Sequence, residues 1–523
     1  MSKKRFQRIS QSPTRPVAKA ERGGFDVAEL YQGPLTSGQP VTQGKSSLDE
    51  KLRQAYFWIV NEGIISPFYD IAFNTSPPKV MHFGDSRVPI DLPSDQSYSS
   101  YVLLPLLNLA VRRRCLLVGG PGRGKTVIAT IIGVLSGYSI DEVRRGIQHG
   151  QPQMTIADLL GNPLPSSLVS AQSMDEVKIA WRKWLGMRIK IIDEYNRIPT
   201  RTQSALLTVM ADNYAELYDQ IFECPPSAWY LTANDDAGGG TYQVIEALRD
   251  RIDVVVKALH FNSRFIYKLL QRIEAGIKPE DIVPEEIVFT EAELDQIAKD
   301  IRGIPFPDSL QRRLEYFVSQ FEFFEPGAKC FDYMTKDTVK IAGIPLNSFS
   351  ETGKDSTIDI GGQTKNGISV RALMTIISFV KAMAYFRGNN EVSFEDIRQI
   401  IPFVLHDKLV QNVDSPFFEK AGNGAYRSDH VNWLRHLFDM SCAEYERLNR
   451  DTDDPVLQEL ELFEKGLDGL SATEVRKRMA RIEKTLRLWN KQKLHGSMLD
   501  DILTLKYLHQ RYTNYWNWLQ CQS

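Results

Sequence analysis

The stretch from Gly119 to Thr126 combines glycines, a lysine and a hydroxyl at a spacing suited to holding a polyphosphate. It fits the pattern G-x-x-x-x-G-K-[ST], with an apolar run before it and helix-forming residues after it. Glycines let backbone N–H groups face the phosphates, and the start of the following helix adds positive potential. The lysine can neutralise phosphate oxygens, and the threonine hydroxyl can be a ligand of Mg²⁺. The predicted binding residues are Gly119, Gly120, Pro121, Gly122, Arg123, Gly124, Lys125 and Thr126.

An acidic pair and an asparagine follow two later apolar runs. Asp193 and Glu194 come after Ile189–Ile192, and Asn234 comes after Trp229 to Ala233. Because neighbouring side chains on a strand alternate, the two acids can differ in role. Asp193 would hold the Mg²⁺ water shell, and Glu194 would activate the attacking water as a general base. Asn234 would orient that water or contact the γ-phosphate. Alone, such residues usually form a solvated turn, but their position after a phosphate loop favours chemistry.

These side chains need a scaffold that brings several strand ends together. Strands are expected at Cys115–Val118, at Ile189–Ile192 and at Ala228–Thr232, with a helix starting at Lys125. Strands that alternate with helices in this way predict a parallel sheet covered by helices. After about residue 262, amphipathic helical segments replace the strands.

Composition sets limits on other classes of protein. The chain has 523 residues, with 63 Lys plus Arg against 65 Asp plus Glu, a net charge of −2 that does not select nucleic acid or membrane as a partner. The most apolar stretch, residues 101–110, is too short for a membrane span, and the start of the chain lacks the apolar core of a signal peptide. Five scattered cysteines without a CxxC pair indicate neither a disulfide framework nor a zinc site. We therefore expect a cytoplasmic protein without a membrane span.

Four sequence blocks, in order after the phosphate loop, resemble those of MoxR-family AAA+ ATPases, whose relatives include RavA-type, CbbQ/NorQ-type and magnesium-chelatase-type motors. The block Asp193–Leu207 is similar to the family's DEINRAPPKTQSALL, and Gly240–Ile252 is similar to its EGTYPLPEAQLDRF. Gly367–Leu373 resembles the GASPRA element, and Val392–Arg398 resembles the V-x-P-E-D-V block. Together the blocks cover roughly residues 100–410 of this chain.

The resemblance implies a fold, an activity and further site residues. The implied fold is an α/β P-loop NTPase (AAA+) core with a parallel sheet flanked by helices, an all-helical lid and, in this chain, a helical C-terminal extension. The implied reaction is hydrolysis of ATP with Mg²⁺. Asn234 is then expected to be sensor 1, Arg251 the arginine finger that reaches a neighbouring subunit, and Arg371 the sensor 2 that reports nucleotide state to the lid. Arg249 is the alternative finger, because Arg-Asp-Arg offers two candidates.

The chain is expected to divide into five parts. The C-terminal part would contain a coiled-coil-like hairpin, because Ser471 and Glu474 form a capping-box signature before an apolar seam and a second helix starts at Ser497. Its aromatic residues Tyr512, Tyr515, Trp516 and Trp518 are expected in the hairpin core. The predicted parts are a disordered basic tail (1–45), an N-terminal extension (46–100), the AAA+ α/β nucleotide-binding domain (101–262), a helical lid with an insert at 326–367 (263–410) and the helical C-terminal extension (411–523).

Three functions are compatible with these observations. The first is a ring motor, a hexamer by family expectation, that remodels or activates a protein client together with a von Willebrand A domain adaptor. The second is an ATP-driven nucleic-acid factor that uses the basic tail or the basic helix at residues 476–493. The third is an ATP-dependent assembly scaffold with little turnover. The first is the leading hypothesis, because the family serves protein clients.

Overall fold

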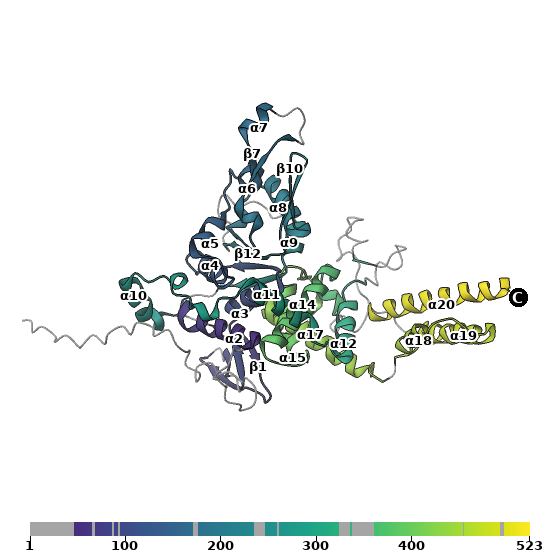
Figure 1. Cartoon of the computed structure of the whole chain (residues 1–523). Helices are drawn as coiled ribbons and strands as arrows, with labels where there is room; N and C mark the ends of the chain where they lie inside the picture. The colour runs from purple at the N-terminus through teal and green to yellow at the C-terminus, as the bar shows by residue number, and fades with distance from the viewer. Residues whose placement is uncertain are drawn as a thin grey trace, which may run out of the picture.

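A five-stranded parallel sheet forms the centre of the α/β domain in this computed structural model (Figure 1). The strand order is β13-β5-β12-β9-β6, and all neighbours pair in parallel. The strands are β5 (Arg114–Val118), β6 (Gln148–His149), β9 (Ile189–Asp193), β12 (Ala228–Ala233) and β13 (Val254–Lys257). The structure describes residues 47–64, 68–85, 88–92, 95–170, 176–234, 246–258, 261–323, 335–336, 360–452, 454–491 and 496–522.

The strands are apolar on both faces because helices cover both faces, as in parallel sheets generally. Alternate residues of each strand enter two different cores. Cys115 and Leu117 of β5 face the helices α3 (Ser100–Val111) and α4 (Lys125–Leu135), whereas Leu116 faces α6 (Ile156–Leu160), α8 (Thr200–Asp212) and α9 (Glu246–Arg251). The parallel sheet flanked by helices confirms the predicted fold class, and the apolar stretch 101–110 is part of the buried helix α3.

The helical lid packs against the α/β domain through α3. Its helices are α11 (Glu291–Gly303), α12 (Asp308–Ser319), α14 (Val370–Phe386), α15 (Phe394–Leu405) and α17 (His430–Arg447), and their buried faces belong to the same core as α3 and α4. Because α17 is part of this core, the predicted boundary at residue 410 does not coincide with a break in packing. Most of the predicted insert at 326–367 lies outside the described residues, as does the predicted basic tail.

The N-terminal extension is attached to the lid rather than standing apart from it. Its first helix, α2 (Leu48–Trp58), continues into a short π-helical turn and contacts α14. Arg53 donates to the carbonyl of Phe386 at 3.0 Å, and the rings of Tyr56 and Tyr98 pack edge-on against the Phe386 ring. The buried side chains of α2 and of residues 71, 73 and 98 therefore belong to the same core as the lid.

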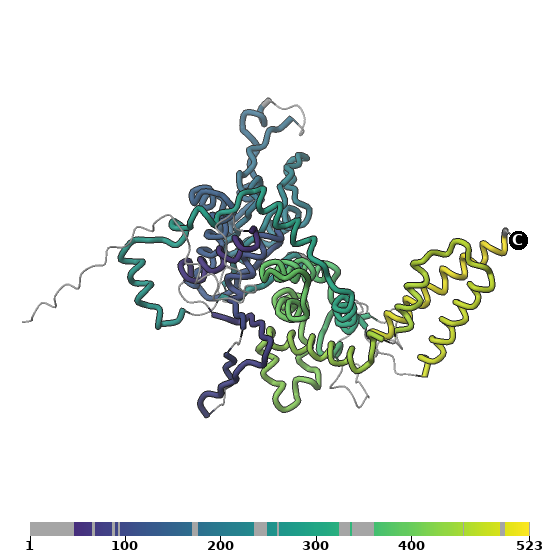
Figure 2. The backbone as a smooth tube through the Cα atoms, turned by 60° about the horizontal axis from the view of Figure 1, so that its bottom comes forward, coloured from purple at the N-terminus to yellow at the C-terminus, as the bar shows by residue number. Residues whose placement is uncertain are grey.

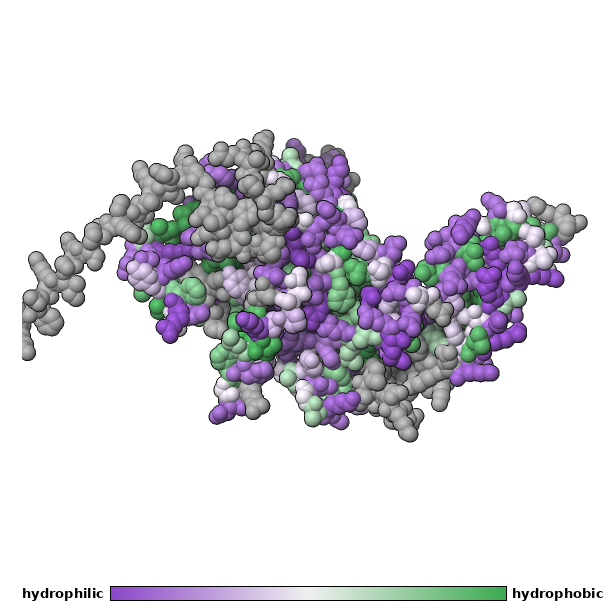
Figure 3. All heavy atoms as spheres, turned by 90° about the horizontal axis from the view of Figure 1, so that it is seen from below, coloured by the Kyte–Doolittle hydropathy of each residue, from purple (hydrophilic) through white to green (hydrophobic). Residues whose placement is uncertain are grey.

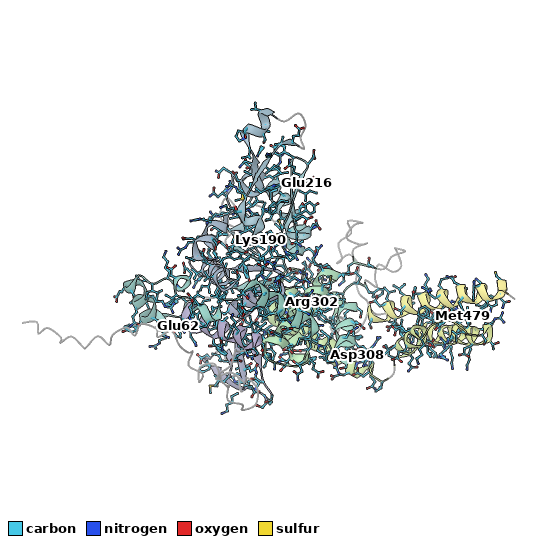
Figure 4. The ribbon with its side chains drawn as sticks, in the orientation of Figure 1. Glu62, Lys190, Glu216, Arg302, Asp308 and Met479 are labelled. Atoms are coloured by element: carbon cyan, nitrogen blue, oxygen red, sulfur yellow. The ribbon has the colours of Figure 1, made fainter. Side chains whose placement is uncertain are left out.

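Four antiparallel strand pairs lie outside the central sheet. The pairs β1–β4 and β2–β3 fall in residues 71–98, and the pairs β7–β8 and β10–β11 fall in residues 161–223. Figure 1 shows β7 and β10 projecting from the α/β domain, and Figure 4 labels Glu216 on β10. Their bounds are β1 (Ile71–Phe73), β2 (Lys79–Phe83), β3 (Val88–Leu92), β4 (Gln96–Tyr98), β7 (Gly161–Pro163), β8 (Ile179–Trp181), β10 (Tyr214–Leu217) and β11 (Gln220–Glu223).

The last three helices form a hairpin-like unit that stands away from the rest of the molecule (Figure 2). These helices have their own small core around Val475, Ile482, Leu505 and Tyr512. Trp518 was expected in this core but is 50% exposed, because it lies on the outer face of its helix. The helices are α18 (Pro455–Glu464), α19 (Ala472–Trp489) and α20 (Gly496–Gln522). Further helices in the described residues are α5 (Ile140–Gly146), α7 (Pro165–Ser170), α10 (Ile266–Ala275) and α16 (Pro416–Glu419).

Candidate functional site

The phosphate loop connects the end of β5 to the start of α4. Gly119 N donates to Ala233 O at 3.3 Å, so the loop starts beside the end of β12. Gly119 has φ 151°, and a Cβ there would lie 3.0 Å from the carbonyl oxygen of Ala258, so the backbone leaves no room for a side chain. On the other side, the Tyr101 hydroxyl of α3 donates to Arg123 O at 3.1 Å. The loop is thus held by both neighbouring strands and by α3.

Lys125 joins the phosphate loop to the end of β12. Its Nζ donates to Gly119 O at 2.6 Å, to Gly120 O at 2.8 Å and to Asn234 Oδ1 at 2.9 Å. The residue is only 7% exposed. The ammonium therefore lies inside the loop, held by three oxygens that a phosphate could replace.

The two predicted metal ligands are in contact. Thr126 Oγ1 donates to Asp193 Oδ1 at 2.8 Å, and Thr232 Oγ1 donates to the same carboxylate oxygen at 2.6 Å. Thr232 Oγ1 also accepts from Glu194 N at 2.9 Å. A hydroxyl and a carboxylate side by side form an oxygen-only donor set, which is the set that Mg²⁺ prefers when substrate phosphates supply further ligands. The residues present therefore fit this ion.

Glu194 is held by two donors. Its Oε1 accepts from Asn234 Nδ2 at 2.9 Å, and its Oε2 lies 3.1 Å from Arg197 Nε in an ion pair. Its backbone is in the left-handed region, with φ 53°, a conformation that a non-glycine residue adopts only where surrounding contacts impose it. On the next strand, His149 Nδ1 lies 3.4 Å from Asp193 Oδ2. The cleft thus contains Lys125, Thr126, Asp193, Glu194 and Asn234 in one connected set of contacts.

The three candidate arginines lie elsewhere. Arg249 and Arg251 are on α9, and Arg371 forms an ion pair with Asp250 of the same helix. The next aspartate, Asp253, accepts from Arg114 N at 3.0 Å, which places it level with the first residue of β5.

The phosphate loop begins at the other end of β5, directly after Val118, which lies four residues and about 13 Å along the strand from Arg114. Arg371 is therefore held near the end of β5 that lies opposite to its own phosphate loop. Arg371 therefore pairs with α9 and not with the phosphate loop of its own chain, and Arg251 stands on α9 two residues before Asp253.

Sequence reasoning missed two residues that hold the site together. Thr232 binds both the Asp193 carboxylate and the Glu194 backbone, and Tyr101 supports the phosphate loop. A signal for Thr232 was present, because residues two apart on a strand share a face and Thr232 stands two residues before Asn234. Tyr101 carried no such signal, since its contact depends on how α3 packs.

Comparisons with known proteins place this geometry in a class. Residues 114–254 match the family model described as "ATPase family associated with various cellular activities (AAA)", and residues 360–425 match the AAA lid domain. The chain is 25% identical over 315 residues to Chaperone MoxR1 of Mycobacterium tuberculosis, covering 59% of this chain and 71% of that one. A crystal structure of an unconfirmed ATPase from Cytophaga hutchinsonii, 16% identical, aligns over 64% of this chain and 89% of that chain with a TM-score of 0.43.

The phosphate loop, the acidic strand end and the helical lid define an AAA+ ATPase domain. Within that class, the similarity to Chaperone MoxR1 together with the two matched models supports a MoxR-family AAA+ ATPase. Among the residues that the structure describes, no helix is long and apolar enough to cross a membrane. Within the same residues, no cluster of three or more His, Cys, Asp or Glu side chains could hold a metal ion.

Proposed function

We propose that the protein is a ring-forming motor that hydrolyses ATP with Mg²⁺ and uses the energy to remodel or activate a protein client in the cytoplasm. The observation that carries the proposal is the connected set of contacts from Lys125 through Asn234 to Glu194, and from Thr126 to Asp193. These residues place a lysine ammonium that can bind phosphates, a pair of oxygen ligands for a metal ion and a general base together at the carboxyl ends of the strands. That combination suits phosphoryl transfer to water.

Each residue has a defined task in this proposal. Thr126 and Asp193 would hold Mg²⁺, which neutralises phosphate charge when bound. Lys125 exchanges its three present oxygen partners for phosphate oxygens. Glu194 accepts a proton from the attacking water once one of its carboxylate oxygens leaves its present donor, Arg197 or Asn234. The amide of Asn234 then orients that water.

A single chain lacks the arginines that complete such a site. Arg371 and the helix that carries Arg251 lie toward the end of the strands opposite to their own phosphate loop. Both arginines would therefore serve the nucleotide of a neighbouring copy. An arginine supplied from a neighbour contributes about 10³- to 10⁵-fold to phosphoryl transfer. Hydrolysis should therefore require a ring, and six subunits is the family expectation.

The client is proposed from the family rather than from the site. The similarity to a protein named Chaperone MoxR1 supports a chaperone-like task on a protein client. A von Willebrand A domain protein as adaptor is proposed from the sequence resemblance to the family alone. The nucleic-acid alternative has less support, because Arg481 and Arg487 of α19 already form ion pairs with Glu459 and Glu483. The face of this hairpin seen in Figure 3 is mostly hydrophilic, as expected of a solvated helix. A scaffold without turnover would not need Glu194 and Asn234 placed together.

Phosphate release at several protein concentrations tests the proposal. The wild-type rate per subunit should rise with protein concentration as rings form, and Glu194→Gln should bind ATP but release phosphate at least 100-fold more slowly. Affinity capture with Glu194→Gln and ATP should then retain a protein client. No ATP hydrolysis at any concentration would refute the motor, and capture of nucleic acid alone would refute the protein client.

A further inference from the structure

The carboxylate of Asp250 is bound on both oxygens by the first residues of α14. Arg371 Nη1 forms an ion pair with Oδ2, and Ser369 Oγ donates to Oδ1 at 3.3 Å. Ser369 is also the residue that caps α14, since its hydroxyl accepts from Ala372 N. The N-terminal end of a helix carries partial positive charge, which favours a carboxylate at this position. Asp250 therefore joins the start of the lid helix to α9, the helix that carries Arg251.

A second aspartate three residues later has a different task. Asp253 is fully buried and accepts hydrogen bonds from Thr375 Oγ1 and from Arg114 N, so it fastens α14 to the start of β5. Asp250 is 38% exposed and lies one helical turn nearer the surface. Asp253 thus fixes the lid on the sheet, whereas Asp250 sets how α9 and the first turn of α14 lie relative to each other.

We infer that Asp250 is a positioning residue that holds Arg251 and Arg371 as one cationic unit for the nucleotide site of the next copy. The inference rests on the ring ATPase proposed above. Asp250 pairs with Arg371 and directly precedes Arg251 in the chain. A carboxylate close to two arginines that serve one triphosphate reduces the repulsion between them. The described part of α9 has six residues and is anchored in the core by Leu248, with the buried Ile252 directly after it, and Asp250 adds an ion pair to the lid.

The predicted effect of removing this tie is specific to turnover. A displacement of about 1 Å in a catalytic group can cost about 100-fold in rate. For Asp250→Asn we therefore expect kcat to fall about 10- to 100-fold. The Kd for ATP should change less than twofold, because Lys125 and Asp193 lie at the carboxyl ends of the strands, away from Asp250. Asp250→Glu, which keeps the charge, should recover most of the lost rate.

Asp295→Asn is the matched control. Asp295 also joins the lid to the α/β domain, because its carboxylate on α11 pairs with Arg112 and Arg188, but it lies away from α9. We expect its loss to leave kcat within twofold of wild type. A similar loss of rate in both variants would mean that any bridge between lid and sheet has the same effect, and it would overturn the role of Asp250.

Mixing variants tests whether Asp250 acts on the neighbouring site. Asp250→Ala subunits retain Lys125 and Glu194, whereas Glu194→Gln subunits retain Arg251 and Arg371. In mixed rings, a Glu194→Gln subunit can supply its arginines to the nucleotide site of a neighbouring Asp250→Ala subunit. Hydrolysis should therefore reappear at a third or more of the wild-type rate per Asp250→Ala subunit. Lys125→Ala mixed with Glu194→Gln should stay inactive, because both kinds then lack a working site of their own.

The outcomes separate this inference from the proposed function. Wild-type turnover per subunit that does not depend on protein concentration would refute the ring and the inference with it. Turnover that depends on concentration, combined with an Asp250→Asn variant as active as wild type, would refute only the role of Asp250. An inactive Asp250→Ala variant that binds ATP but is not rescued in mixed rings would also refute it, since the defect would then lie in its own site.

Discussion

The hydroxyl of Thr232 offers the sharpest test of how the site is built. It donates to Asp193 Oδ1 at 2.6 Å and accepts from Glu194 N at 2.9 Å, and the residue is fully buried. Thr232→Val keeps the shape of the side chain and removes both hydrogen bonds. The carboxylate then keeps Thr126 as a donor, whereas the backbone N–H of Glu194 loses its partner.

The size of the effect follows from these two bonds. A hydrogen bond to a charged group contributes about 1.5–3 kcal/mol, and an unsatisfied buried N–H costs about 1–3 kcal/mol. If the bond to Asp193 is needed fully in the transition state, kcat should fall about 10- to 100-fold, because each 1.4 kcal/mol is tenfold in rate. The free energy of unfolding should fall by about 2 kcal/mol. ATP affinity should change less than threefold, since Lys125 is untouched.

Phosphate release, ATP titration and urea unfolding measure the three quantities. Thr232→Ser keeps the hydroxyl and should retain most of kcat. Thr202→Val is the matched control, because Thr202 is also buried and donates to Met154 O at 2.8 Å, but it lies on α8 away from the cleft. It should lose stability without losing kcat. A Thr232→Val variant with wild-type kcat would show that this hydroxyl does not position the acidic pair.

Three further variants test other parts of the structure. Burial lowers the pKa of Lys190 (Figure 4) from 10.5 to about 8, so the unfolded chain binds a proton that the folded chain lacks between these pH values, and stability rises with pH. Between pH 7.5 and 9.5, the free energy of unfolding in urea should rise by about 2 kcal/mol more for wild type than for Lys190→Met. An equal rise in both proteins would contradict this. Tyr101→Phe removes the donor to Arg123 O and should weaken ATP binding about fivefold by calorimetry; unchanged affinity would mean that the loop does not need this support. Tyr512→Ala should destabilise the C-terminal hairpin by about 3 kcal/mol in hydrogen exchange without changing ATP hydrolysis, because the hairpin has a core of its own; a loss of hydrolysis would show coupling between the two.

Local sequence patterns predicted the elements with strong signals of their own. The three predicted strands agree with β5, β9 and β12 to within one residue at each end, because long apolar runs next to a glycine loop or an acidic pair leave few alternatives. The two-residue β6 and the projecting β10–β11 pair were missed. Strands this short carry too little periodicity to be recognised, and they form because neighbouring elements supply their partners.

The sequence patterns also gave no indication that α17 and the N-terminal extension pack against the lid. The predicted boundary at residue 410 followed the end of the sequence blocks that resemble the family, whereas α17 packs into the lid core through Trp433, Leu437 and Phe438. The N-terminal extension likewise packs on the lid. Such joins depend on complementary surfaces between segments far apart in the chain, for which a single sequence contains no local signal.

The sequence by itself determined which residues form the proposed nucleotide site, because Lys125, Thr126, Asp193, Glu194 and Asn234 stand at strand ends or directly after the glycine loop. Only the tertiary structure decided which atoms meet: Thr232 under the acidic pair, Tyr101 behind the phosphate loop, and Arg371 beside Asp250 at the far edge of the sheet. The physical reason is that a strand has two ends about 13 Å apart. A motif states that an arginine is present, but packing alone decides which end it reaches.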